Sequence, residues 1–175
     1  MISDIDTDLG DQLKAAFRRY PTGVAVISAN GPAGPAGLTA SSVASVSVAP
    51  PALSFSLLST ASARAVLDAP TFVVNLLGPD DADLARDFAH SSGPRFTPEQ
   101  GWGTLPTGEP FLPAALASLR CSAMHRLPVG DATVIVGAVL GVHLGSASGH
   151  LIHHNRRFLP FHQTPSPVRP EPGAA

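Results

Sequence analysis

The stretch GLTASSVASVSVAPPALSFSL, residues 37–57, contains the pattern that decides the fold. Apolar side chains alternate with serines in both halves of it. Alternation with a period of two is typical of β-strands, because successive side chains point to opposite faces of a sheet. The pair Pro50-Pro51 cannot continue a hydrogen-bonded strand. We therefore predict one strand over 37–48 and another over 53–57, separated at the prolines.

The rest of the chain carries further strand signals, at residues 22–29, 71–77, 115–126, 132–142 and 149–158. One face of the longest apolar run carries Val134, Val136, Ala138, Leu140 and Val142. Helical spacing or capping residues predict helices over 5–19, 61–68 and 79–89. Segments rich in Gly and Pro predict a loose hairpin connection at 30–36 and a long loop at 91–112. Because the strands are short and only two short helices lie between them, the sequence predicts a mainly β fold with flanking helices, an antiparallel barrel.

The length and composition indicate one globular domain. A chain of 175 residues can bury a sizeable core, and we place the domain at 1–162. The remainder, 163–175, is Pro-rich with little to bury, so we predict a disordered tail. Charged residues make up 14% of the chain, and the net charge is −2. With no run of cations in the sequence, we expect no nucleic-acid partner.

The N-terminal sequence and the cysteine content indicate the cellular compartment. The N-terminal sequence MISDIDTDLGDQ carries acids where a signal peptide has cations and an apolar stretch. No segment approaches the ~20 apolar residues that cross a bilayer. The single cysteine, Cys121, fits a reducing compartment, so we expect a cytoplasmic protein without a membrane partner. Cys121 is either a nucleophile or a buried small apolar residue, and free cysteines are usually the latter.

The first candidate site is the serine-rich segment Thr39-Ala40-Ser41-Ser42, which continues to Ser45 and Ser47. Small hydroxyl side chains leave a low, polar strand face. A flat aromatic ring could lie against that face and take hydrogen bonds from backbone and hydroxyl groups. The alternative is that these serines form the solvated face of an edge strand.

The second candidate site is Ser59-Thr60-Ala61-Ser62, which follows a strand and opens a helix. The start of a helix presents unpaired N–H groups and the positive end of the helix dipole, a combination that suits a phosphate. Arg64 or Arg86 could add a positive charge. The alternative is ordinary helix capping by Ser59 or Thr60.

The third candidate is the histidine-rich stretch HLIHHNRRF, residues 150–158. His150 and His154 have helical spacing, but the surrounding residues favour strand or loop and no carboxylate lies nearby, so we expect no metal site. The stretch is either a basic edge that meets a nucleotide or a subunit, or a solvated turn. The chain contains neither GxGxxG nor GxxxxGK[ST], so a nicotinamide cofactor would not be held by a Rossmann unit.

Six motifs in a fixed order resemble the flavin reductase-like domain family, the short-chain flavin reductases, over residues 13–160. They are FRRYPTGVAVIS, the stretch 37–57, STASARAVLDAPTFVVNLL, an acidic helix ending in Phe88-Ala89, CSAMHRLPVGDATVIVGAVLGV, and HLIHHNRRF. The resemblance implies a split β-barrel of Greek-key order that binds FMN or FAD, in a homodimer. It also implies hydride transfer from NADH or NADPH to N5 of the flavin, with no essential acid–base side chain. Reduced flavin would pass to a separate flavin-dependent monooxygenase.

The resemblance also implies residue roles. The residues expected to bind flavin are Thr39, Ala40, Ser41, Ser42, Ser45, Ser56, Leu57, Ser59, Ser62, Arg64, Phe88 and Phe96, with Arg95-Phe96 in a segment that covers the flavin. The family often has histidine after Gly130-Asp131, near the nicotinamide, but this chain has Ala132. The residues that could replace it are His125, His153, His154 and Arg156. The alternatives are a flavin sensor or carrier without turnover, and a related split-barrel protein that makes pyridoxal phosphate or binds haem.

Overall fold

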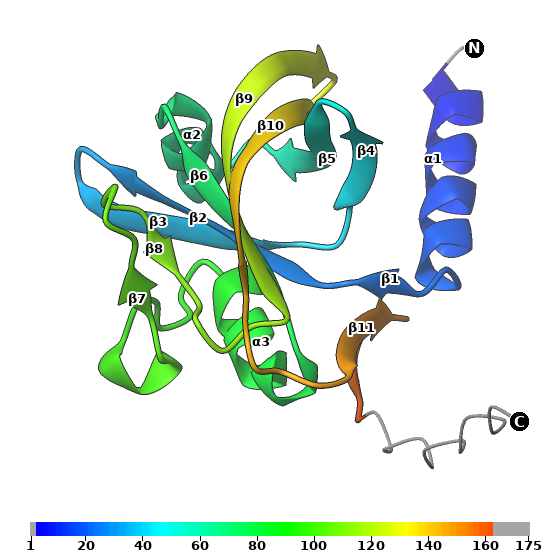
Figure 1. Cartoon of the computed structure of the whole chain (residues 1–175). Helices are drawn as coiled ribbons and strands as arrows, with labels where there is room; N and C mark the ends of the chain where they lie inside the picture. The colour runs from blue at the N-terminus through cyan, green and yellow to red at the C-terminus, as the bar shows by residue number, and fades with distance from the viewer. Residues whose placement is uncertain (1–2, 163–175) are drawn as a thin grey trace, which may run out of the picture.

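The computed structural model describes residues 3–162 (Figure 1). The tail predicted at 163–175 lies outside this range. The helices are α1 (Ser3–Arg18), α2 (Ala61–Asp68) and α3 (Ala82–Ala89), with single turns η1 (Pro79–Asp81) and η2 (Pro98–Gln100). The strands are β1 (Thr22–Gly23), β2 (Ala25–Gly31), β3 (Gly34–Ala40), β4 (Ala44–Val48), β5 (Pro51–Leu58), β6 (Phe72–Leu76), β7 (Gly103–Thr104), β8 (Pro110–Phe111), β9 (Ala117–Val129), β10 (Ala132–Leu144), β11 (His150–His154) and β12 (Arg157–Phe161). The predicted mainly β fold with flanking helices is confirmed.

The main sheet has seven antiparallel strands in the order β3-β2-β6-β9-β10-β5-β4. Its first and last strands, β3 and β4, are consecutive in the chain and are joined by residues 41–43. The curved sheet therefore brings the end of β3 near the start of β4, as the path of the ribbon shows (Figure 1). A smaller sheet of order β1-β11-β12 and the short pair β7-β8 flank it.

The core lies on both faces of β2, as the apolar pattern of residues 22–29 predicts. On one face, α2 covers a cluster in which Phe55 and Phe72 pack edge to face, with ring centroids 5.3 Å apart. On the other face, α3 contributes Phe88 to a second cluster. A Cβ atom at Gly37 of β3 would lie 2.9 Å from the Phe88 ring, so glycine permits this close approach.

The structure corrects several predicted boundaries. The strand expected over 37–48 is interrupted at 41–43, where the chain leaves one end of the sheet for the other. The connection expected over 30–36 is a tight turn at Pro32-Ala33, because pairing continues to Gly31 and Gly34. The run 149–158 is a hairpin of two strands, β11 and β12. The loop 91–112 contains η2, β7 and β8.

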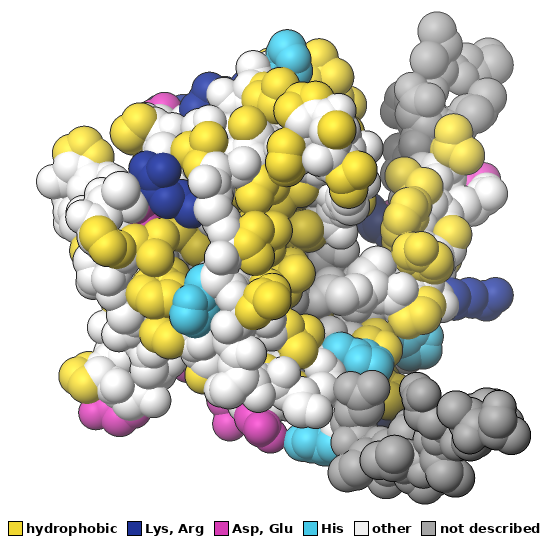
Figure 2. All heavy atoms as spheres, in the orientation of Figure 1, with side chains coloured by type: hydrophobic (Ala, Val, Ile, Leu, Met, Phe, Trp, Pro, Cys, Tyr) yellow, Lys and Arg dark blue, Asp and Glu magenta, His cyan; other side chains and the backbone are white. Residues whose placement is uncertain are grey.

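The orientation of β10 also departs from a simple period of two. Its fully buried side chain is Ile135, whereas Leu140 and Val142, expected on an apolar face, are exposed by 52% and 57%. The pairing of β10 with β9 shifts register twice. The first shift leaves Met124 of β9 unpaired, and the second leaves Leu140 of β10 unpaired, which re-aims the side chains that follow it on β10. Figure 2 shows the resulting apolar side chains, in yellow, along the middle of one face of the molecule.

Helix α1 lies to one side of the sheets (Figure 1). The predicted apolar face is present, but it is uncovered, and Phe17 is 64% exposed. A backbone hydrogen bond of 3.0 Å from Asn155 N to Arg18 O ties the end of α1 to the β11–β12 turn. Neither α1 nor any other helix within residues 3–162 has the length and apolar character to cross a bilayer.

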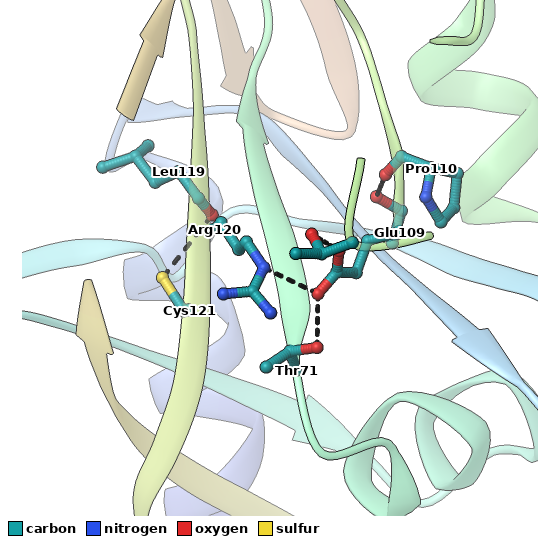
Figure 3. Close-up of polar contacts among 8 residues, drawn as sticks. Thr71, Glu109, Pro110, Leu119, Arg120 and Cys121 are labelled. Carbon is teal, nitrogen blue, oxygen red and sulfur yellow. Dashed lines mark hydrogen bonds and ion pairs between the residues drawn. The ribbon is translucent and has the colours of Figure 1, made fainter. Parts of the chain in front are cut away.

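Cys121 is fully buried on β9, and burial raises the pKa of its thiol to about 12. A thiol with so high a pKa is not a nucleophile at neutral pH. Its Sγ contacts the carbonyl oxygen of Leu119 at 3.5 Å (Figure 3). Of the two interpretations from sequence, the buried apolar residue is therefore the better one.

Two buried polar groups anchor the segment before β9. The side-chain amide of Asn75 donates to Val26 O at 3.0 Å and accepts from Leu112 N at 2.9 Å. The carboxylate of Glu109 accepts hydrogen bonds from Thr71 and Thr107, and it pairs with Arg120 at 2.8 Å (Figure 3). Both groups fix the loop 91–112 against the sheet.

We predict that Glu109 makes folding stability depend on acid pH. Burial alone would raise the pKa of this carboxyl, but hydrogen bonds from Thr107, Thr71 and its own backbone, together with Arg120, lower it to about 2 from 4.5. Its contribution of ~2–3 kcal/mol is therefore present above pH 4.5 and is lost as the pH falls toward 2. Urea unfolding of the wild type and of Glu109→Gln between pH 7 and 3 measures this. Parallel pH profiles for the two proteins would contradict the assignment.

Candidate functional site

Ser42, the last residue of the first serine segment, is bound to the backbone of β5. It lies in the break between β3 and β4, facing β5. Its hydroxyl donates to the carbonyl of Ser56 at 3.2 Å and accepts from the amide of Ser56 at 2.9 Å. These are the two backbone groups that a neighbouring strand would otherwise satisfy. The Ser42 side chain therefore replaces one rung of strand pairing where the two ends of the sheet approach.

A cavity of about 790 Å³ opens beside this bridge. Its walls come from the ends of β3 and β5, the start of α2 and the segment that follows α3. The residues on these walls are Leu38, Thr39, Ala40, Ser41, Ser42, Ser56, Leu57, Leu58, Thr60, Ala61, Ser62, Phe88, Ala89, His90, Ser91 and Arg95. The volume and the mixture of apolar and hydroxyl groups suit a cofactor-sized organic ligand.

One end of the cavity is built to hold an anion. Thr60 caps α2 by accepting a hydrogen bond from Ala63 N at 3.1 Å. The other N–H groups at the start of a helix have no partner within the helix and can bind an anion. Arg95 donates from Nη1 to the Ser62 hydroxyl at 3.3 Å and from Nη2 to His90 O at 2.7 Å. The Nε of Arg95 is buried without a hydrogen-bond partner within residues 3–162. An unpaired buried donor is costly, so this guanidinium is suited to an anionic acceptor.

An aromatic cluster holds Arg95 in position. Phe96 and Trp102 have ring centroids 4.7 Å apart, and both pack on Phe88. The Phe88 ring in turn lies 5.7 Å from the Arg95 guanidinium carbon. Phe96 has a left-handed backbone, with φ of 57°, which turns the chain just after Arg95. At Gly93, a Cβ atom would overlap the carbonyl oxygen of Asp87, so glycine lets this segment pass close to α3.

The other end of the cavity is lined by small groups. The Thr39 hydroxyl donates to Ala85 O at 2.7 Å and the Ser42 hydroxyl is bound to Ser56, so both are used within the protein. Ala40 contributes a methyl group. What remains for a ligand is the Ser41 hydroxyl, backbone groups at the break in the strand, and a low surface that a planar ring could cover.

A second groove of about 860 Å³ lies on the other side of the bridge and shares Ser41, Ser42 and Ser56 with the first cavity. Its opposite wall is formed by α1 and the β11–β12 hairpin, which contribute Lys14, Arg18, His153 and Arg156. Burial and the neighbouring His154 lower the pKa of His153, so His153 is neutral at pH 7. The two hollows are therefore contiguous, and each has positive charge at its outer end.

The family model for the flavin reductase like domain matches residues 17–162, most of the chain. The chain belongs to this family. The resemblance read from the six motifs is confirmed, and the site can be compared with flavin reductases.

Three comparisons illustrate the relationship. The NADH:FMN oxidoreductase of Rhodococcus qingshengii is 39% identical over 150 residues, covering 83% of this chain and 78% of the relative. The reductase component of the FADH(2)-dependent resorcinol hydroxylase of Rhizobium sp. (strain MTP-10005) is 30% identical over 154 residues, covering 86% of each chain. The Streptomyces globisporus NADH:FAD oxidoreductase, solved with NAD and FAD fragments, has a TM-score of 0.79 at 29% identity and covers 89% of this chain and 94% of that one.

The structure gathers most of the residues expected to bind flavin. Those on the first cavity are Thr39, Ala40, Ser41, Ser42, Ser56, Leu57, Ser62 and Phe88. The others lie elsewhere. Ser59 and Arg64 border a separate hollow beyond Thr60, and Ser45 lines an apolar groove beside β4. Phe96 packs behind the cavity rather than on its wall.

Of the basic residues expected near the nicotinamide, some line the second groove and the others lie elsewhere. His153 and Arg156 line the second groove. His154 follows His153 on β11 and, by strand alternation, points away from that groove. His125 is exposed on β9, opposite Val136 of β10, and lines neither hollow. Ala132 opens β10 opposite Leu58 and also lies outside both.

Three cations line the hollows in roles that the sequence did not predict, and of these Arg95 was expected only in the segment that covers the flavin. The charge expected from Arg64 or Arg86 is supplied by Arg95, because Arg64 borders the other hollow and the exposed Arg86 pairs with Asp83. Lys14 and Arg18 were assigned no role, although both line the second groove. Their spacing of four residues on a helix places them on one face and could have signalled this.

We predict that Ser42→Ala exposes the Ser56 amide to solvent. Without the hydroxyl, this N–H loses its acceptor, so its hydrogen exchange should become at least ~10-fold faster, about 1.4 kcal/mol. Exchange followed by NMR measures the effect, with the amides of Phe55 and Leu57 as internal references. Ser45→Ala, on the exposed strand β4, is the matched control. Equal exchange at Ser56 in both variants would show that the bridge does not protect this amide.

Proposed function

We propose that this protein is an NADH-dependent flavin reductase that binds flavin in the first cavity and NADH in the second groove. The observation that carries the proposal is the contiguity of the two hollows at Ser41, Ser42 and Ser56. Hydride transfer needs two rings in van der Waals contact, and a shared wall lets each ligand enter from its own side. The NADH:FMN and NADH:FAD oxidoreductases among its relatives support the same reaction.

The residues of the first cavity fit a flavin. Ser62, the first turn of α2 and Arg95, whose buried Nε needs an acceptor, would hold the phosphate. The surface formed by residues 39–42 and bordered by Ser56 and Leu57 would hold the ring. Bound flavin supplies the hydride acceptor, N5 of its ring system. Hydrogen bonds from Ser41 and from backbone groups at the break orient that ring.

On the nicotinamide side, His153 takes the place of the histidine that many family members have where this chain has Ala132. Because His153 is neutral at pH 7, it acts as a hydrogen-bond partner rather than as a charge. With both ligands bound, hydride would pass directly between the two rings, so no side chain would have to transfer a proton. A flavin carrier without turnover is the second candidate, and the replacement by Ala132 is the observation that favours it.

We propose that reduced flavin leaves this open cavity for a separate oxygenase in the cytoplasm. Ser42, Leu58, Thr60 and Ala61 are exposed on its rim, so release requires no large opening of the protein. A relative that is the reductase component of a resorcinol hydroxylase supports an oxygenase partner. The single buried thiol of Cys121 is compatible with a reducing compartment.

We further propose that the curved sheet is the split β-barrel of the family and that it functions as a homodimer. The support is the amount of apolar surface left uncovered on β4 and β10, where Val48 is 87% exposed and Val142 57%. An apolar groove of about 410 Å³ lies between these strands. Patches of this kind on single chains usually mark interfaces, and a second copy would cover this one symmetrically.

The turnover prediction is that the purified protein oxidises NADH only when flavin is added. Arg95→Gln should raise the KM for FMN about 10-fold or more, and Ser62→Ala should weaken FMN binding by ~1–2 kcal/mol. Riboflavin, which lacks the phosphate, should be used equally well by the wild type and both variants. Arg64→Gln is the matched control. No NADH oxidation with either flavin would support the carrier instead, and an equal loss with riboflavin would remove Arg95 from a phosphate site.

The dimer prediction is that light scattering gives the wild type twice the mass of one chain. Val142→Asp places a charge in the uncovered apolar surface, so it should shift the protein to monomer or make its unfolding midpoint depend strongly on concentration. Ser148→Asp, at an exposed position in the segment after β10, is the control for added charge. A wild-type mass of one chain would refute the dimer.

A further inference from the structure

The second groove carries three cations on one wall. Lys14 and Arg18 come from α1, and Arg156 comes from the β11–β12 turn. No aspartate or glutamate lines this groove within residues 3–162. In a protein whose net charge is −2, such a one-sided cluster creates a local positive potential that attracts an anion.

The backbone fixes the positions from which the side chains of Arg18 and Arg156 extend. The hydrogen bond from Asn155 N to Arg18 O ties the end of α1 to the turn that carries Arg156. Asn155 and Arg156 both have left-handed backbones, with φ of 49° and 62°. A two-residue turn of this kind prefers glycine at its second position, so the arginine is held there against its own conformational preference.

Lys14 completes the cluster one turn before Arg18. Its ammonium lies 3.0 Å from Asp11, but both side chains are 69% exposed. An ion pair so exposed is weak and is readily exchanged for a ligand. One flexible ammonium group and two planar guanidinium groups line the same wall. Together they suit an extended anion with several oxygens rather than a single carboxylate.

We propose that this cluster binds the diphosphate of the nicotinamide dinucleotide, with Arg18 and Arg156 as its main partners and Lys14 at the outer end. The inference rests on the proposed function, because it takes the nicotinamide ring to lie at the shared serine wall. The flavin phosphate is already provided for by Arg95 on the other side of the bridge. The cations of the second groove are therefore left for the other phosphate-bearing ligand. Helix α1 thus selects dinucleotide donors, while the hydride transfer itself occurs at residues 41–42.

The test compares two hydride donors at saturating FMN. NADH carries the diphosphate, and 1-benzyl-1,4-dihydronicotinamide carries the ring without any phosphate. The measured quantity is the ratio of kcat/KM for NADH to kcat/KM for the benzyl donor. Arg18→Gln and Arg156→Gln should each lower this ratio about 5- to 10-fold, mainly through the KM for NADH. Arg19→Gln and Arg157→Gln remove the same charge from neighbouring positions outside the groove and should leave the ratio at the wild-type value.

Ionic strength and backbone strain give two further readouts. The KM for NADH should rise with salt in the wild type, and it should rise less steeply in Arg18→Gln. Arg156→Gly should lower the donor ratio while raising the thermal unfolding midpoint, because glycine relieves the left-handed turn. A lower thermal unfolding midpoint for Arg156→Gly would mean that Arg156 stabilises the fold instead of binding the diphosphate.

The outcomes separate the two proposals. If the wild type oxidises neither donor in the presence of flavin, the reductase function is wrong. If the wild type oxidises both and the ratio is equal in the groove variants and their controls, the reductase stands and the diphosphate site is wrong. An equal fall with both donors would also overturn the diphosphate site, since it would show that the cations act on the flavin or on the fold.

Discussion

The hydrogen bonds between the Ser42 side chain and the backbone of Ser56 determine where everything else in the site lies. At residues 41–43 the chain leaves one end of the main sheet and enters the other, and no strand pairing is available there. A hydroxyl that both donates and accepts can take the place of the missing strand, whereas an apolar side chain would leave two backbone groups unpaired. The same break exposes the backbone to a ligand from either side.

The electrostatics of the site follow from this geometry. The bridge separates two hollows, and each has its positive charge at the end remote from the shared serines. Arg95 is held by an aromatic cluster inside the fold, and its buried Nε needs an anion. The cations of the second groove lie on α1 and on a hairpin turn, both at the periphery. Arg95 is held rigidly, whereas the cations of the second groove are exposed. This combination suits a protein that exchanges both ligands during turnover.

Much of this could be read from the sequence, and the failures have identifiable causes. Period-two alternation located most strands and the six motifs located the family, because both are local signals. Ser62 was expected at the site because helix starts are local, and the structure places it on the first cavity. Arg95 was not chosen over Arg64 because the choice depends on how the segment after α3 folds back across α2. The exposure of Leu140 and Val142 was not predicted, because the register shift at Leu140 arises from pairing with β9 and cannot be seen in one strand alone. Lys14 and Arg18 belong to a helix whose position depends on a tie to Asn155, far away in the sequence.

A crystal structure of the protein with FMN tests the central idea most directly, namely that one ligand joins the two hydroxyl-bearing segments. The ring should lie across residues 39–42 beside Ser56, and the phosphate should contact the Ser62 hydroxyl and the Arg95 guanidinium, including its Nε. A phosphate bound instead beside Arg64 and Asp68, or a ring seated in the apolar groove next to β4, would contradict the account.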